Sequence, residues 1–490
     1  MPARIPFFPL CTSLILTALH PGSSSSQTYT LTTEPITEVA NNDSNTPPFW
    51  EYHQTTITRI NDRVYASSME TVDPGFDSFV KQWRLYERAD TGWQQVYESP
   101  LDQPLNQPPV LLAGPGDTLH VFASPEGRFT HFAFDINNIE NPTLETPDIG
   151  FTEFWPWSSG SINQSGDIGI AMVTGGDDRQ HIQLRDATTG DWSAGVSYTF
   201  DTRSESPTGY DRHTFPFLVL DDGAAHIFSA QDIVDPVKVA EGASYTFSSH
   251  SLDYYYSPDV AATAFQTVSI VDIEGTRGWA HNDDLLLDAS GVVHTLYYTQ
   301  AEQNVSGFSP EMHAFGPPGG PFTHVSLASG FTEGRLWEGP DGTLYALLPA
   351  QDDLYIAALA EDGALAASPE PLGLSPGNWG SLFAGPRIFL SSSRGSAVEI
   401  TVLEGIYRRP TESGRIELRY FRVDAPELAV PIGDFNSDGR VDFNDFLLFV
   451  AQYGQAATSN TPSFDLSENG AIDFDDFLIF AGVFGTIYRS

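Results

Sequence analysis

Cysteine is almost absent from this chain of 490 residues. Cys11 is the only one, and it lies in the N-terminal stretch. The remainder of the chain therefore has no thiol, which excludes intrachain disulfides, thiolate metal sites and a cysteine nucleophile from the main part of the protein.

Positively charged residues are also scarce. Lysine and arginine number 23 against 64 aspartate and glutamate residues, and the formal net charge is −41. The only lysines are Lys81 and Lys238. So acidic a surface repels phosphate backbones, and we expect no nucleic acid partner. It suits either a saline habitat or the collection of divalent cations, and the sequence leaves both open.

Long hydrophobic runs are missing as well. Residues 1–27 read MPARIPFFPLCTSLILTALHPGSSSSQ, in which Arg4 precedes an apolar stretch from Ile5 to Leu19. This stretch is too short to cross a bilayer and has the layout of a secretory signal peptide. No later apolar run reaches the roughly 18 residues that a membrane span needs. We therefore expect a secreted, extracellular protein without a membrane span.

Acids are concentrated near the C-terminus, where residues 434–445 read DFNSDGRVDFND. This spacing is typical of an EF-hand-like calcium loop, in which alternate residues converge on one ion and Gly439 permits the sharp turn. Calcium fits because it is a hard cation that binds six to eight oxygens. The expected ligands are the side chains of Asp434, Asn436, Asp438, Asp442 and Asp445 and the backbone carbonyl of Arg440.

The same pattern recurs 31 residues later as DLSENGAIDFDD. Its expected ligands are Asp465, Ser467, Asn469, the carbonyl of Ala471, Asp473 and Asp476. The second loop has one carboxylate fewer, so we expect it to bind calcium more weakly than the first. Each loop is followed by an amphipathic segment that predicts a short helix.

These paired loop-helix units resemble a type I dockerin, and we assign residues 432–490 to such a module and residues 425–431 to a linker. The resemblance implies that two Ca²⁺ ions fold the module and that a helix face binds a cohesin domain on a scaffold or cell surface. Phe443–Asn444 and Phe474–Asp475 stand where type I dockerins commonly carry small hydroxyl residues. The sequence therefore leaves three uses open: a cohesin-like scaffold partner, a cell-surface layer, or intramolecular docking.

The body of the chain repeats a short unit, in which a β-run, a Gly/Asp turn and a second β-run follow one another. The turns lie about 54 residues apart, near Asp62, Asp117, Gly166, Gly223, Gly291, Gly342 and Gly385. This period is typical of a four-stranded propeller blade with its loops. We therefore predict an all-β, seven-bladed β-propeller domain over residues 28–424, closed by pairing of residues 416–423 with the first segment. Two β-sandwiches are the alternative.

This spacing of the turns is similar to that in the BNR-type propellers of sialidases and polysaccharide lyases. The Asp-box motif S-x-D-x-G-x-x-W is not intact in this sequence, so the resemblance gives sialidase activity little support. What it implies is a propeller that acts on carbohydrate.

Two classes of histidine separate when the blades are aligned on their turns. His226 and His294 lie three residues after the turn glycine, and His120 is close to that register. A residue type repeated in several blades indicates packing. His213 and His281 instead lie ten residues before the turn in two adjacent blades, at the predicted start of an inner strand.

Polar residues surround this second pair. Tyr210 and Arg212 adjoin His213, while Arg277 and Asp283 flank His281. A histidine base, a tyrosine proton donor and an arginine that neutralises a uronate are suited to β-elimination from an acidic polysaccharide. The two histidines with Asp283 would also suit a divalent metal in the propeller. Polar rim residues without a catalytic role are the plainer interpretation, and Trp279 is one of several aromatics that would stack on sugar.

Two functions remain open on the sequence. The first is a secreted polysaccharide lyase or glycoside hydrolase that is tethered by its calcium-binding tail. The second is a non-catalytic propeller that binds a glycan or protein at a cell surface or scaffold.

Overall fold

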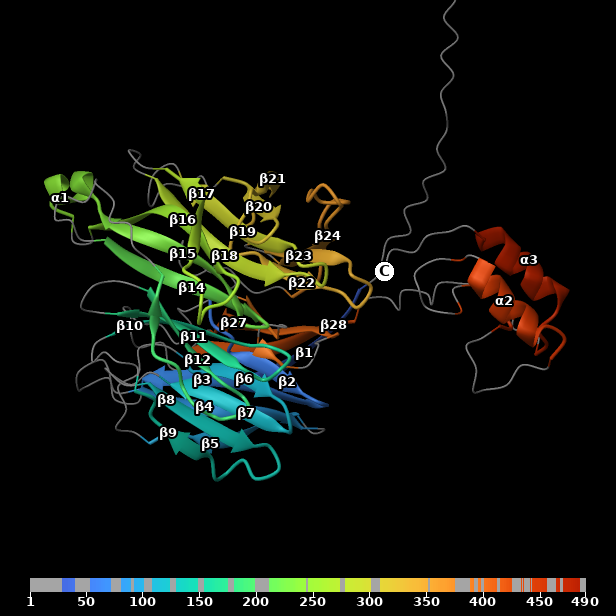
Figure 1. The fold of residues 1–490 in the computed structure, drawn as a ribbon, viewed down its shortest axis with the longest axis horizontal. Helices are drawn as coiled ribbons and strands as arrows, with labels where there is room; N and C mark the ends of the chain where they lie inside the picture. The colour runs from blue at the N-terminus through green and yellow to red at the C-terminus, as the bar shows by residue number, and fades with distance from the viewer. Residues whose placement is uncertain are drawn as a thin grey trace, which may run out of the picture.

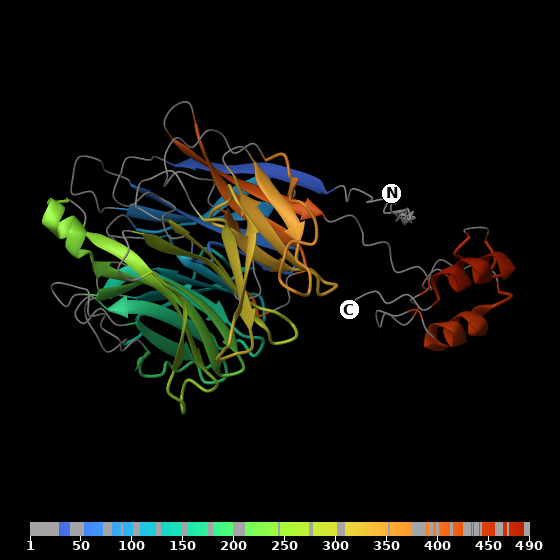
Figure 2. The same ribbon diagram turned by 90° about the horizontal axis from the view of Figure 1, so that it is seen from above.

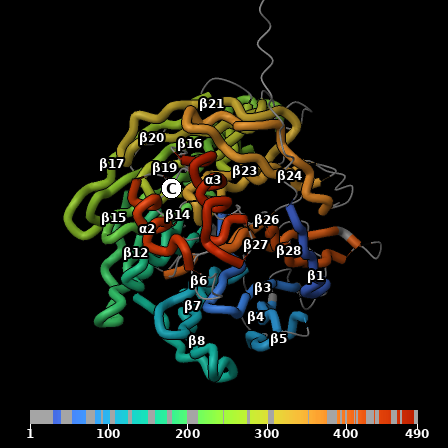
Figure 3. Tube along the Cα trace, turned by 90° about the vertical axis from the view of Figure 1, so that its right-hand side faces the viewer, coloured from blue at the N-terminus to red at the C-terminus, as the bar shows by residue number. Residues whose placement is uncertain are grey.

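The chain folds mainly into antiparallel strands that form seven four-stranded sheets in this computed structural model. The structure describes residues 29–39, 53–71, 81–89, 92–100, 108–123, 129–148, 154–174, 180–198, 211–243, 246–273, 278–300, 309–350, 353–374, 388–391, 395–397, 401–411, 415–424, 433, 435, 441, 443–455, 464–467 and 470–484. The predicted signal peptide and linker lie outside these residues. The sheets are the blades of a seven-bladed propeller, as the repeat predicted, and Figure 3 shows them as a ring.

Each blade is built from strands that follow one another in the chain. Blade one consists of β2 (Ile57–Ile60), β3 (Arg63–Thr71), β4 (Lys81–Ala89) and β5 (Gly92–Glu98). Blade two consists of β6 (Val110–Gly114), β7 (Thr118–Ala123), β8 (Thr130–Asp135) and β9 (Thr143–Glu145). Blade three consists of β10 (Phe154–Ile162), β11 (Ile168–Thr174), β12 (Gln180–Arg185) and β13 (Val196–Ser197). Blade four consists of β14 (Asp211–Asp221), β15 (Ala224–Val234), β16 (Phe247–Ser257) and β17 (Gln266–Asp272).

The remaining blades follow the same order until the last. Blade five consists of β18 (Trp279–Leu287), β19 (Val293–Gln300), β20 (Glu311–Gly316) and β21 (Thr323–Ala328). Blade six consists of β22 (Arg335–Glu338), β23 (Leu344–Pro349), β24 (Leu354–Ala358) and β25 (Glu370–Pro371). Blade seven consists of β26 (Ile388–Leu390), β27 (Leu403–Pro410), β28 (Ile416–Asp424) and β1 (Thr30–Val39).

The ring is closed in blade seven by strands from opposite ends of the propeller domain. β1 pairs antiparallel with β28, from Thr30 opposite Asp424 to Val39 opposite Ile416. The predicted closure is thus confirmed. The first strands of neighbouring blades contact one another around the whole ring, which makes them the inner strands.

The seventh predicted hairpin is displaced from its predicted place. Gly385 lies outside the described residues, but residues 388–390 form the inner strand of blade seven and pair with β27. The sequence had placed them in the second strand of the blade. With only three residues, β26 gives a hydrophobic pattern too short to distinguish the two positions.

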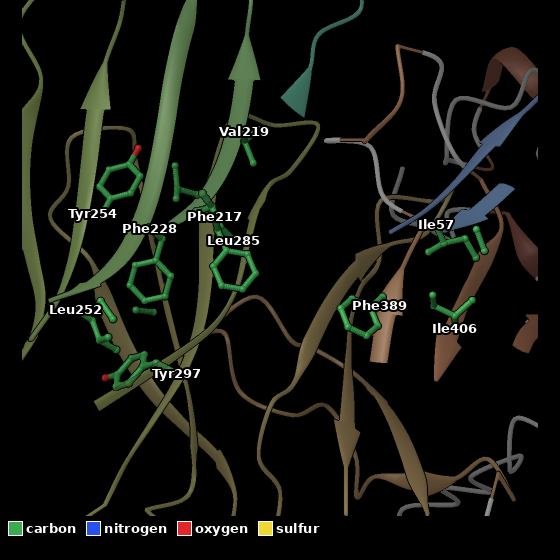
Figure 4. Close-up of a cluster of buried hydrophobic side chains, with 14 of the residues drawn as sticks. Ile57, Phe217, Val219, Phe228, Leu252, Tyr254, Leu285, Tyr297, Phe389 and Ile406 are labelled. Carbon is green, nitrogen blue, oxygen red and sulfur yellow. The ribbon is translucent and has the colours of Figure 1, made fainter. Parts of the chain in front are cut away.

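The core lies between the blades, because each sheet packs its faces against both neighbours. Figure 4 shows Phe217, Phe228 and Leu285 among the apolar side chains gathered between blades four and five, with Ile57 and Ile406 in a second group. Burying both faces of a sheet explains why the strands read as nearly continuous apolar runs and carry few exposed large residues.

The C-terminal module contains two helices, α2 (Phe443–Gln452) and α3 (Phe474–Val483), which Figures 1 and 2 draw beside each other and apart from the propeller. The apolar cluster of the module includes the buried Phe449 of α2 and the buried Ile472, which precedes α3. Asp473 caps α3 in a capping box with Asp476, the arrangement that satisfies orphan N–H groups at a helix start. No helix of the described residues is long and apolar enough to cross a membrane.

Candidate active site

His281 lies near the start of the inner strand of blade five, where the predicted site was placed. Its side chain is 12% exposed. Tyr298, directly opposite on β19, stacks on the imidazole with ring centroids 5.0 Å apart and planes inclined by 8°. This contact fixes the plane of a histidine that still reaches the surface.

A buried carboxylate lies behind His281. Asp283 is completely buried, and its Oδ1 atom is 3.5 Å from His281 Nδ1. The strand register shifts between Asn282 and Asp284. An extra residue at such a bulge re-aims the side chains around it. The local backbone irregularity is thus associated with a carboxylate directed at a partly exposed imidazole.

Asp283 forms a buried acid pair with Glu311, the first residue of β20, which is also fully buried. Burial raises the pKa of Asp283, and His281 opposes that rise. The pKa of Glu311 is raised well above its usual value, first by burial and then by the charge of Asp283. Two adjacent buried carboxyl groups do not both ionise readily, so Glu311 is the protonated member.

Arg335 supplies positive charge to this pair. The side chain is 1% exposed and its Nη1 donates a 2.6 Å hydrogen bond to the backbone carbonyl of Asp283. Asp284, the next residue, accepts a hydrogen bond from the backbone N–H of Leu336. These two bonds tie the start of blade six to the bulge in blade five.

His213 lies one blade away and in a different inter-blade space. It is 6% exposed on β14, and its ring meets that of Tyr255 edge to face with centroids 6.4 Å apart. Tyr255 in turn packs on Tyr198, which follows the last strand of blade three. His213 therefore faces blade three, whereas His281 faces blade four through Phe215, whose ring is stacked 6.4 Å away.

The side chains of the other predicted catalytic residues are not among those that the structure describes. Tyr210 and Arg277 lie outside the described residues. Arg212 is on β14 opposite Asp232, but its side chain is not among those described. All three stay predictions.

His53 belongs to the same region and was missed by the sequence reasoning. It precedes β2, is completely buried, and lies edge-on to Phe215 at 5.6 Å and to Phe217 at 6.2 Å. Blade one therefore contacts blade four across the ring. The repeat could not reveal it, because His53 falls outside the strand-turn-strand unit on which the blades were aligned.

Metal binding was expected at the inner-strand end and in the tail. Among the residues with described positions, no group of three or more His, Cys, Asp or Glu side chains could hold a metal ion. The divalent-metal alternative for His213, His281 and Asp283 thus gains no support. In the first tail loop Asp434, Asn436, Asp438, Arg440 and Asp442 lie outside the described residues, as does Asn469 in the second.

The described part of the tail loops has the hydrogen bonds of a closed loop. Asp465 accepts a bond from the backbone N–H of Gly470, and Asp476 accepts from Ser467 and Asp473. In the first loop Asp445 accepts from the N–H of Phe435. The first and last acidic positions of the second loop therefore both bond to the backbone of that loop.

No family model and no curated protein matches this chain. Solved structures do resemble it. The polysaccharide lyase Uly1 matches with a TM-score of 0.51 at 13% identity, over 76% of this chain and 90% of its own. A PL25 ulvan lyase bound to -[GlcA(1-4)Rha3S]- matches with a TM-score of 0.52 at 10% identity, over 79% and 95%. At such identities the likeness shows the propeller fold.

Proposed function

We propose that this protein is a carbohydrate-active propeller that cleaves a uronate-containing polysaccharide by β-elimination, with His281 as the base. The observation that carries the proposal is the partly exposed imidazole of His281, with the buried Asp283 3.5 Å behind it. A carboxylate in that place fixes the imidazole orientation and stabilises its protonated form.

The reaction requires a base on one side of the uronate and a proton donor for the leaving group. His281 would take the proton from C5, the C4–C5 double bond would form, and the C4–O bond would break. The departing oxygen would take a proton from an acid, for which Tyr210 stays the sequence-based candidate. Tyr298 holds the imidazole in place by ring stacking.

The fold likeness supports polysaccharide as the substrate class. Two polysaccharide lyases share the propeller over most of their length, and the one solved with -[GlcA(1-4)Rha3S]- binds a uronate. Function does not follow from a fold alone. The pair formed by His281 and Asp283, here called the dyad, therefore carries the argument.

The test is an assay of the full chain on acidic and neutral polysaccharides. Absorbance of the 4,5-unsaturated product reports elimination, and new reducing ends without that absorbance report hydrolysis. We expect elimination with an acidic polymer and a loss of about 10²- to 10⁴-fold in kcat for His281→Gln.

A matched control lies in the same blade. His324 is on β21 and bonds Tyr297, away from the dyad, so His324→Gln should retain activity. Product in neither channel with any polymer would overturn the proposal, as would equal losses in the two variants.

We propose separately that the tail holds two Ca²⁺ ions in the loops 434–445 and 465–476. The bonds of Asp465 and Asp476 to the backbone of their loop support this, and clustered carboxylates would otherwise repel one another. Calcium would cross-link each loop and stabilise the module. Such a tail would tether the protein to a cohesin-like or cell-surface scaffold, and the predicted signal peptide of residues 1–27 would export it.

Calorimetric titration of the chelator-treated full chain tests the tail. We expect two calcium-binding events, the tighter lost in Asp434→Asn and the weaker in Asp465→Asn, with the propeller melting transition unchanged. Absence of heat and of any change in helical circular dichroism would refute calcium binding without affecting the lyase proposal.

A further inference from the structure

An arm of blade four projects beyond the candidate site. β15 and β16 have eleven residues each, longer than most strands of the other blades, and they are joined by the helix α1 (Pro236–Glu241), visible at the left of Figures 1 and 2. The start of β14 pairs with the end of β15, Asp211 opposite Ile233. The arm therefore extends from the end of the ring at which the inner strands begin.

The arm is held in a defined shape. The buried Asp235 caps α1 by accepting from the backbone N–H of Val237 and accepts a further bond from Ser248 Oγ on β16. Gly242 ends the helix with φ of 70°, a left-handed conformation that glycine adopts without strain. α1 is thus a fixed feature of this end of the propeller.

α1 places one of the two lysines of the chain against the strand that carries the dyad. Lys238 Nζ donates a 2.6 Å hydrogen bond to the carbonyl of Phe247 and lies 5.3 Å from the ring centroid of Trp279. Trp279 is the first residue of β18. An ammonium group over an indole face is a favourable cation–π contact.

Trp279 and His281 lie two residues apart on one strand, before the bulge at Asp283. Residues i and i+2 of a strand point to the same face. The ammonium group of Lys238, the indole of Trp279 and the imidazole of His281 therefore follow one another along one face of blade five, and both aromatic residues are partly exposed.

We propose that Lys238 and Trp279 form an anion-recognising sugar subsite next to His281, in which the indole supports a sugar ring and the ammonium group binds its acidic substituent. The inference rests on the proposed function, because it names the substrate class of the same site. The ligand chemistry is an anionic oxygen group on a pyranose, either a carboxylate or a sulfate.

The net negative charge of the protein makes the ammonium group of Lys238 important for binding an acidic polymer. A chain with a net charge of −41 repels an acidic polymer at long range, so binding needs local positive charge. Burial lowers the pKa of Lys238 below its usual value, and Asp235 and Asp232 of the same arm offset part of that fall. These two acids favour the charged ammonium group, and the bond to Phe247 fixes its position.

Binding assays separate this subsite from catalysis. Affinity electrophoresis and calorimetry would be run in the His281→Gln background with polyglucuronate, dextran sulfate and neutral dextran as probes. We expect Lys238→Met to weaken binding of an acidic probe about tenfold at low salt and much less at 0.5 M salt, because salt screens the charge. Lys238→Arg should retain most of the binding.

Lys81→Met is the matched control, since it removes the only other lysine, on β4 of blade one. Preference for polyglucuronate would identify a carboxylate as the ligand, and preference for dextran sulfate would identify a sulfate. Equal losses in Lys238→Met and Lys81→Met, or no loss at Lys238, would overturn the subsite. Charge-specific binding in this background, together with no unsaturated product from the unsubstituted chain, would support the subsite and refute the lyase.

Discussion

The histidines at the turn end of the propeller and His281 at the other end lie in opposite environments. At the end where the first strand of each blade turns into the second, histidines are paired with one another and buried. At the end where the inner strands begin, His281 stays partly exposed and has a buried acid behind it.

At the turn end, hydrogen bonds join the histidine rings to one another in short chains. His120 Nδ1 bonds His131 Nε2 at 2.8 Å, and His131 Nδ1 bonds Glu145 at 2.6 Å. His294 and His313 are 3.0 Å apart in the same arrangement. Both nitrogens of a central ring are thereby used, so these rings can neither bind nor exchange protons with a substrate without breaking the packing.

The register of a histidine in the blade thus indicates packing for the residues that follow the turn, but it does not separate His213 from His281. The predicted packing role of His120, His226 and His294 agrees with their burial and with bonds such as that of His226 to Tyr254 at 2.7 Å. The catalytic role of His213 and His281 stays a prediction, and their environments already differ.

After His281→Gln, the largest expected effect comes from Asp283→Asn. An amide cannot stabilise the protonated imidazole as a carboxylate does, so elimination should fall about 10²-fold or more while the fold persists. The measurement is kcat together with the melting temperature. Unchanged kcat in a folded variant would contradict the dyad and remove the contrast between the two ends.

At the turn end, His313→Ala should affect stability instead. The substitution leaves a cavity and removes the partners of His294 and of the Gly363 carbonyl, at a cost of about 2–4 kcal/mol in the free energy of unfolding. Denaturant titration measures it. Activity per folded molecule should be unaltered, and a lost activity with normal stability would reverse the assignment.

Acid should destabilise the propeller by protonating the buried histidines at the turn end. Burial lowers the pKa of His120 to about 3 and those of His226 and His313 to about 4, against about 6.5 in an unfolded chain. The unfolded state therefore takes up protons first, and stability present above pH 6.5 is lost as pH falls toward 4. Melting temperatures across that range should fall, and less so in His226→Phe.

The smallest expected effect is a gain in stability in Glu311→Gln. Because the pKa of Glu311 is raised in the folded state, its contribution is present at low pH and is lost as pH rises through that pKa. A neutral amide avoids this loss, so the variant should be more stable at alkaline pH. Melting at pH 5 and pH 9 tests it, and a gain restricted to pH 5 would contradict protonation of Glu311.

Much of the fold was predictable because turns are local. Six of the seven hairpins and the closure by residues 416–423 follow from sequence patterns. Residues 388–390 were assigned to the wrong strand of their blade because the strand has only three residues. His281 and Asp283 were found as neighbours in sequence, whereas Tyr298, Glu311 and Arg335 reach the site only through strand pairing and blade packing, which a single sequence does not reveal.

The pairing of Thr30 with Asp424 has a consequence for biogenesis. The strand made first by the ribosome must wait for one of the last before the ring can close, and contacts so distant in sequence are slow to form. Until residues 416–424 have been made, β1 has no β28 to pair with. Truncation anywhere before residue 416 should therefore yield an aggregation-prone chain rather than a smaller propeller.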